Sequence, residues 1–297
     1  MNQLKTLVLL GLLGSLIVLT GYLLVGDEQG LYYGLGFAAV GSFGSWYYSD
    51  RAALAAFKAQ PTPPEEAPEL SCRIKKLSDR AGIPNPTLYI VPSKSPNAFA
   101  TGRDPNHAAI ALTEGIIDLL PADELDAVIA HELTHVRNRD TLTQAVASTL
   151  AGSLTYLGRI LTLGALYFPV ARVGRRGNNP IAILFLLLVG PLSAGLLRMA
   201  ISRTREYAAD LGSAEITQNP LALVRALEKL EATGQEFPIH GNPAFAPLFI
   251  VNPLSKKGLM SLFLTHPPTE DRIERLKAMA QSADVAADVP KELSPAT

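Results

Sequence analysis

The pentapeptide His131-Glu132-Leu133-Thr134-His135 decides how the rest of this chain is interpreted. Residues four apart lie one above the other on a helix, so both imidazoles point the same way and can bind one metal ion. Glu132 lies beside them, where its carboxylate can act as general base on a metal-bound water. Two histidines on a polar helix surface are the alternative, because so short a pattern also arises by chance.

The helix that carries this motif is expected over residues 121–139, because apolar side chains recur on one of its faces. Those side chains are Leu125, Ile129, Leu133 and Val136. The two histidines and Glu132 lie on the flank of this face. We therefore expect the site at the edge of the core, half-buried, where a cleft can form.

A second pair of candidate residues, Glu206 and Asp210, lies one turn apart on a later helix. A catalytic zinc often has two histidines and one glutamate, with water in the fourth place. Glu206 therefore fits as the third ligand, and Asp210 fits as the carboxylate that orients a ligand imidazole, most simply that of His131. An exposed acidic pair beside Arg203 and Arg205 is the alternative.

Composition places the chain near a membrane and away from nucleic acid. Its 297 residues are 48% apolar with a mean hydropathy of +0.19, which is high for a soluble protein. The formal net charge of -1 gives no sign of nucleic-acid binding. The single cysteine, Cys72, cannot form an internal disulfide, which suits a reducing compartment.

Two apolar stretches at the beginning of the chain, residues 6–25 and 31–48, are each about long enough to cross a bilayer. The loop between them is short and acidic, whereas basic residues flank the pair, so the positive-inside rule places both ends in the cytoplasm. We expect residues 1–50 to form a transmembrane helical hairpin. Residues 51–69, rich in proline, are expected to form an exposed linker.

A second apolar pair, residues 142–170 and 181–197, predicts an inserted membrane hairpin at about 142–198. Arginines at its tip conflict with the positive-inside rule, and Arg159 lies inside its first half. The hairpin therefore either crosses against the rule or only dips into the membrane. In both cases it returns the chain to the side it left, which allows His135 and Glu206 to meet.

The remaining chain predicts a mainly helical α+β domain over residues 70–280 with a small sheet. Strands are expected at residues 87–91, 98–100 and 108–112, and helices at residues 70–81, 114–120, 221–233 and 269–279. Residues 281–297 are expected to form a flexible tail because they are rich in alanine, proline and charged residues.

Several motifs in order resemble the HtpX family of membrane zinc metalloproteases and, more distantly, the CAAX prenyl endopeptidases. Residues 131–140 read H-E-L-T-H-V-R-N-R-D, like the family's H-E-L-x-H-x-x-N-x-D. Residues 97–102 resemble its N-A-F-A-T-G, residues 202–210 its S-R-x-x-E-x-x-A-D, and residues 266–273 its H-P-P-T-x-x-R-I. The resemblance covers nearly the whole chain up to about residue 280.

The resemblance implies a multi-pass protein of the cell (inner) membrane with a zincin-like catalytic domain on the cytoplasmic side. It implies an endopeptidase that binds one zinc ion per chain through His131, His135 and Glu206. Quality control in the stress response is the implied role, with unfolded or misassembled membrane proteins as substrates and the lipid bilayer as a further partner.

The resemblance also makes His266 the candidate donor to the oxyanion, with Arg272 supporting either that donor or the substrate. A plain helix-start role before Pro267 is the alternative for His266. Residues 98–100, Ala98, Phe99 and Ala100, are expected to present an edge strand to which an extended substrate adds, with an interior strand as the alternative. Asn138 and Asp140 are expected to fix the end of the motif helix.

Three other functions compete with this one. A membrane protein that binds zinc without catalysis would not need Glu132, since a structural site needs no base and closes with a fourth ligand. A CAAX-type prenyl-protein endopeptidase would need more membrane helices than four apolar stretches supply. A scaffold for membrane partners gives no reason for two imidazoles and two carboxylates at these spacings.

Overall fold

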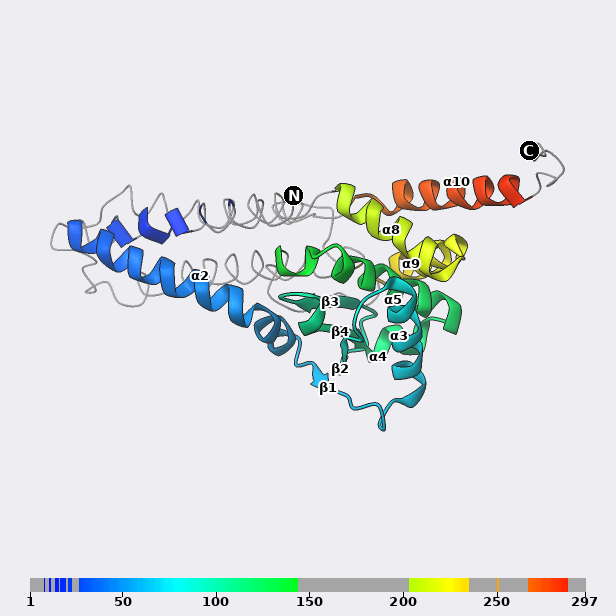
Figure 1. Cartoon of the computed structure of the whole chain (residues 1–297), viewed down its shortest axis with the longest axis horizontal. Coiled ribbons are helices and arrows are strands. Elements are labelled where there is room, and N and C mark those ends of the chain that lie inside the picture. The colour runs from blue at the N-terminus through cyan, green and yellow to red at the C-terminus, as the bar shows by residue number, and fades with distance from the viewer. Residues whose placement is uncertain are drawn as a thin grey trace, which may run out of the picture.

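The computed structural model describes residues 27–143, 203–234, 250 and 267–287, with scattered residues between 8 and 22 (Figure 1). Within these ranges the architecture is mainly helical α+β, as predicted. The helices are α2 (Glu28–Ala56), α3 (Pro68–Ala81), α4 (Glu114–Leu119), α5 (Ala122–Arg137), α8 (Arg203–Thr217), α9 (Pro220–Gly234) and α10 (Thr269–Ala287), with a 3-10 turn at Pro105–His107. The strands are β1 (Gln60–Pro61), β2 (Thr87–Val91), β3 (Ala98–Gly102) and β4 (Ala108–Thr113).

The four strands form one mixed sheet in the order β1-β2-β4-β3. β2 is parallel to β4, whereas β3 is antiparallel to β4 and lies at the edge. Gly102 ends β3 with a φ of +135°, and a side chain there would collide with the carbonyl oxygen of His107. The tight return from β3 into β4 therefore requires glycine at this position.

Helices cover both faces of the sheet. On one face, α5 packs against β3 and β4 and is itself enclosed by α3, α8 and α9. On the other face, Ala53 and Leu54 at the end of α2 pack against Phe99 and Ala111. From there α2 runs away from the sheet toward one end of the molecule (Figure 1). The motif helix α5 is thus the central helix of the domain.

α5 begins after Pro121 and carries Asp123 and Glu124 in its first turn, where they complement the helix dipole. It ends at Arg137, and Arg139 then adopts a left-handed φ of 58° that turns the chain away from the helix axis. The helix is therefore slightly shorter than the predicted 121–139. This turn decides where the next residue, Asp140, is placed.

α8 approaches α5 closely because Gly212 has no side chain. A Cβ atom at Gly212 would overlap the side chain of Thr134 on α5. Ser213 on the same helix donates from its hydroxyl to the carbonyl oxygen of Ala127 over 2.6 Å. These contacts fix α8 against the motif helix.

At the N-terminal end, Val18 and Gly21 approach α2 at backbone distance. A Cβ on Gly34 would lie 2.7 Å from the Cα of Val18, so the close approach depends on the absence of a side chain at Gly34. Within the described residues, the structure contains no helix that combines the length and apolarity needed to cross a membrane. Most of residues 6–25 and nearly all of residues 142–198 lie outside the described ranges.

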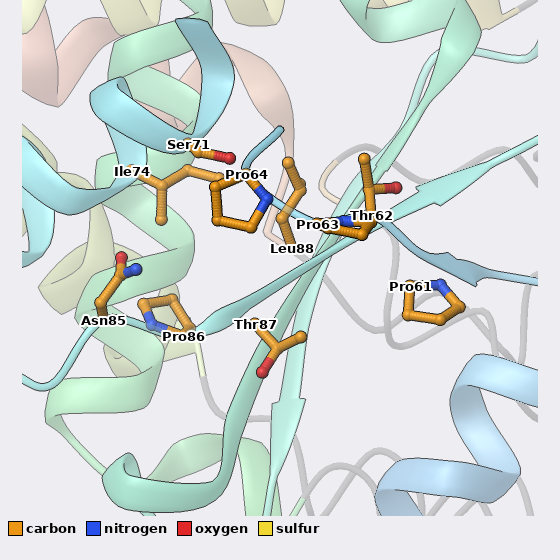
Figure 2. Close-up of a pocket in the computed structure, with 10 residues that line it drawn as sticks. All are labelled: Pro61, Thr62, Pro63, Pro64, Ser71, Ile74, Asn85, Pro86, Thr87 and Leu88. Carbon is orange, nitrogen blue, oxygen red and sulfur yellow. The ribbon is translucent and has the colours of Figure 1, made fainter. Parts of the chain in front are cut away.

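Helices and strands extend into two ranges that are expected to be a linker and a tail. The expected linker, residues 51–69, contains the end of α2, the strand β1 and the start of α3. Pro61 in β1 pairs with Tyr89, and residues 61–64 line a pocket of about 380 Å³ with α3 and the start of β2 (Figure 2). The expected tail begins as helix, because α10 continues to Ala287 through an alanine-rich sequence that favours helix.

Candidate metal centre

α5 and α8 bring His131, His135 and Glu206 together, with one candidate ligand atom from each lying within 4.8 Å of the others. Glu206 Oε2 is 3.8 Å from His131 Nε2, and Glu206 Oε1 is 3.7 Å from His135 Nε2. These separations exceed a hydrogen bond. Tetrahedral zinc with bonds of about 2.1 Å holds its ligand atoms roughly 3.4 Å apart, so the three side chains fit such an ion.

The predicted half-buried position is wrong, because all three side chains are buried. His131 is 1% exposed, His135 3% and Glu206 0%. α8 covers the flank of α5 that the sequence pattern leaves open. The alternative of surface histidines and an exposed acidic pair is therefore excluded.

His131 contacts Asp210, the carboxylate that is expected to orient it. Its Nδ1 lies 3.1 Å from Asp210 Oδ1, which leaves Nε2 directed at Glu206. Arg272 donates to the same carboxylate twice, from Nη2 over 2.6 Å and from Nε over 2.9 Å. Burial raises the pKa of Asp210, but the charge of Arg272 and the hydrogen bonds from His131 and Arg272 outweigh it and lower the pKa to about 2.

Asp140, which is expected to fix the end of the motif helix, also contacts His135. The Nδ1 atom of His135 lies 3.2 Å from Asp140 Oδ2. Arg205 lies behind this carboxylate, with Nη1 3.7 Å from Asp140 Oδ1. Burial lowers the pKa of His135, but the hydrogen bond to Asp140 and the nearby carboxylates of Glu206 and Glu132 raise it to about 9.

Glu132 is only 6% exposed and is held by the edge strand. The backbone N–H of Ala100 donates to Glu132 Oε2 over 2.9 Å. Burial raises the pKa of Glu132, the two histidines oppose this rise, and Glu206 adds to it. A carboxylate with a raised pKa is a better proton acceptor near neutral pH than an ordinary glutamate.

The formal charges of the buried cluster suit a divalent cation. Its four carboxylates are Glu132, Asp140, Glu206 and Asp210, and its two guanidinium groups are Arg205 and Arg272. A histidine that binds a metal must be neutral, and in that state the described residues of the cluster carry four negative and two positive charges, a net charge of -2. Uncompensated buried charge is costly, and one divalent ion brings the sum to zero.

The sequence did not predict that the backbone of Ile250 is held by two side chains near the site. The side-chain oxygen of Asn97 accepts a hydrogen bond from the backbone N–H of Ile250 over 3.2 Å. Arg272 Nη1 donates to the backbone carbonyl oxygen of Ile250 over 3.0 Å. Asn97 thereby joins the start of β3 to the Arg272–Asp210 pair. Arg272 is thus placed behind Asp210, while His266 lies outside the described residues.

Comparison with known proteins agrees with this geometry. Residues 64–280 match the sequence model of Peptidase family M48. This chain belongs to peptidase family M48. The Protease HtpX homolog of Nostoc punctiforme is 50% identical to this M48 peptidase over 280 residues, covering 94% of this chain and 97% of that protein. The Protease HtpX homolog of Thermococcus sibiricus is 43% identical over 288 residues, covering 95% of this chain and 98% of that protein.

The fold of this M48 peptidase is similar to that in the crystal structure of S. mikatae Ste24p, with a TM-score of 0.52 and 20% identity. The similarity covers 93% of this chain but just under two thirds, 65%, of the Ste24p chain. At this identity the likeness concerns the fold alone. The protein is an HtpX-type M48 metallopeptidase with His131, His135 and Glu206 as its candidate zinc site.

Proposed function

We propose that this M48 peptidase is an integral membrane zinc endopeptidase that cleaves misfolded or damaged membrane proteins at the cytoplasmic face. The observation that carries the proposal is the convergence of two imidazoles and one carboxylate beside a buried Glu132. His131, His135 and Glu206 would hold the zinc ion. When bound, zinc supplies a Lewis acid that lowers the pKa of water and polarises a peptide carbonyl.

Glu132 acts as the general base. Its Oε2 is tied to the N–H of Ala100, so Oε1 is the atom that accepts a proton from the attacking water. The raised pKa of the carboxyl suits it to hold this proton and then to deliver it to the leaving amine. His266 is proposed as the donor to the oxyanion, by its place in the motif that ends the chain's resemblance to the family.

The outer edge of β3 is proposed to bind the substrate backbone. Ala100 directs its N–H away from β4 and toward Glu132, so the alternation of a strand directs the backbone groups of Ala98 to the same side. An extended peptide can add there as a further strand, next to the base. Thr141 closes this edge at one end, because its hydroxyl donates to the carbonyl oxygen of Gly102 over 3.0 Å.

The side chain of Phe99 has a different role from that of its neighbours. It is 2% exposed and packs against Phe57 near the end of α2, with ring centroids 5.0 Å apart. Phe99 therefore anchors the substrate strand to the opposite face of the sheet, and small side chains at Ala98 and Ala100 face the motif helix.

Association with a bilayer is supported by the surface of α2. Four large side chains of α2 are 65–75% exposed, namely Tyr32, Phe37, Val40 and Phe43. So many exposed apolar side chains on one helix are unusual for the surface of a soluble protein. Lipid is the environment that such a surface fits. The basic residues that flank the N-terminal apolar stretches support a cytoplasmic position for the catalytic domain.

The test compares substrates and metal content in one preparation. Detergent-purified protein would be given an unfolded membrane protein, a folded soluble protein and a prenylated peptide, before and after zinc is removed and restored. We expect cleavage of the unfolded membrane protein, its loss with the metal and its return with zinc. Cleavage of the prenylated peptide alone would instead identify a prenyl-protein endopeptidase.

A further inference from the structure

The two histidines of the metal centre are supported by matching sets of side chains from different parts of the chain. His131 contacts Asp210, which contacts Arg272, and His135 contacts Asp140, which is followed by Arg205. The first set is tight, because Arg272 makes two hydrogen bonds of 2.6 and 2.9 Å to Asp210. In the second set, the guanidinium of Arg205 lies 3.7 Å from Asp140.

Arg205 is costly to keep in this position. It is 7% exposed, and its three side-chain nitrogens make no hydrogen bond within the part of the chain that the structure describes. Burial lowers the pKa of Arg205, and the charges of Asp140 and Glu206 oppose this effect. A buried cation with so few contacts needs a reason to be retained. Its neighbour Arg203, two residues earlier on α8, is exposed.

We propose that Arg205 is a positioning residue of the metal centre, which holds Asp140 in place and thereby sets the ring orientation of His135. This inference rests on the metal site proposed above. Arg205 precedes the ligand Glu206 by one residue, so α8 would supply one ligand directly and orient another through Asp140. Partners of this kind tune metal binding without touching the metal.

Replacement of Arg205 by methionine separates positioning from charge, because the two effects have opposite signs. Loss of one positive charge near the site would, by Coulomb attraction alone, make a divalent cation bind more tightly. Loss of the hold on Asp140 would let the His135 ring rotate and make the cation bind more weakly. We expect the positioning effect to dominate.

The experiment measures Zn²⁺ affinity by competition with a chelator and records the visible spectrum of the Co²⁺-loaded full-length protein. R205M is expected to bind Zn²⁺ on the order of tenfold more weakly and to change the Co²⁺ bands. R205K keeps the charge without the planar fork and should recover part of the affinity. The control R203M should match the parent protein in both measurements.

A double-mutant cycle with Asp140 tests whether Arg205 acts through that carboxylate. D140N should weaken Zn²⁺ binding by itself, and adding R205M to D140N should weaken it little further. Affinity of R205M equal to or above that of the parent, with an unchanged Co²⁺ spectrum, would overturn the proposal. If the parent protein takes up no Zn²⁺, the metal site itself fails and this inference fails with it.

Discussion

The backbone N–H of Ala100 donates to the carboxylate of Glu132 over 2.9 Å, which joins the edge strand β3 to the proposed base. The strand expected to bind substrate is thus the element that fixes the base. A substrate that adds to β3 is placed in register with Glu132 by the same backbone. The sheet and the motif helix therefore act as one unit in the proposed reaction.

Replacement of Ala100 by proline removes this N–H while keeping an edge position that tolerates proline. We expect kcat to fall by about tenfold or more, since a hydrogen bond to a charged group contributes roughly 1.5–3 kcal/mol. Zinc content should not change, because the lost hydrogen bond goes to Glu132, which is not one of the three proposed ligands. The control A100G keeps the N–H and should retain most activity. Equal activity of A100P and A100G would contradict this role.

Replacement of Asp210 by asparagine leaves Arg272 buried without its charged partner. Zinc affinity should fall by about 10–100-fold, since Asp210 orients the ligand His131. The metal-free protein should also lose about 3–5 kcal/mol of stability, the usual cost of breaking a buried pair. Chelator competition and chemical unfolding measure the two effects. D271N, an exposed aspartate on α10, serves as the control and should leave both unchanged.

The contribution of Asp210 to stability should depend on pH in acid. Its pKa falls from an ordinary 3.8 to about 2 on folding, so the stabilisation, on the order of 2 kcal/mol, is present above about pH 4. It is lost as the pH falls from about 4 toward 2. The stability difference between the metal-free parent and D210N should therefore shrink over this range. A difference that stays constant down to pH 2 would refute the assignment.

Replacement of Gly212 by alanine should push α8 away from α5. The new Cβ would overlap the side chain of Thr134, so we expect a loss of about 1–3 kcal/mol in unfolding free energy and weaker zinc binding. T134A removes the atoms that clash, so the double variant G212A/T134A should recover much of the unfolding free energy and of the zinc affinity. G36A on α2, where nothing lies within 4 Å, is a matched control that should be neutral.

The sequence is sufficient to find the residues whose positions depend on helical spacing. His131 and His135 follow from one turn of α5, and Glu206 and Asp210 from one turn of α8. Their burial does not follow, because it depends on α8 packing onto α5 at Gly212. The set of strands could be predicted only in part, since β1 has two residues and is a strand only because it pairs with β2.

Residues that reach the site from outside these helices could not be predicted in the same way. Asp140 lies beyond the end of α5, and its contact with His135 depends on the left-handed φ of Arg139. Asn97 acts through a contact with the distant Ile250, which no local period encodes. Arg205 lies on α8 itself, but its contact with Asp140 depends on how α8 packs against α5. The place of Asp140 at the end of the motif in residues 131–140 is a local signal for this residue, but it does not show that the carboxylate contacts His135.

The central claim is that Glu132 is the base of a zinc endopeptidase. It is tested most directly by purifying the parent protein and E132Q together and measuring zinc content and peptide-bond cleavage on each. The account predicts about one zinc per chain in both proteins, with cleavage by the parent and none above background by E132Q. Cleavage by E132Q at the rate of the parent would contradict it.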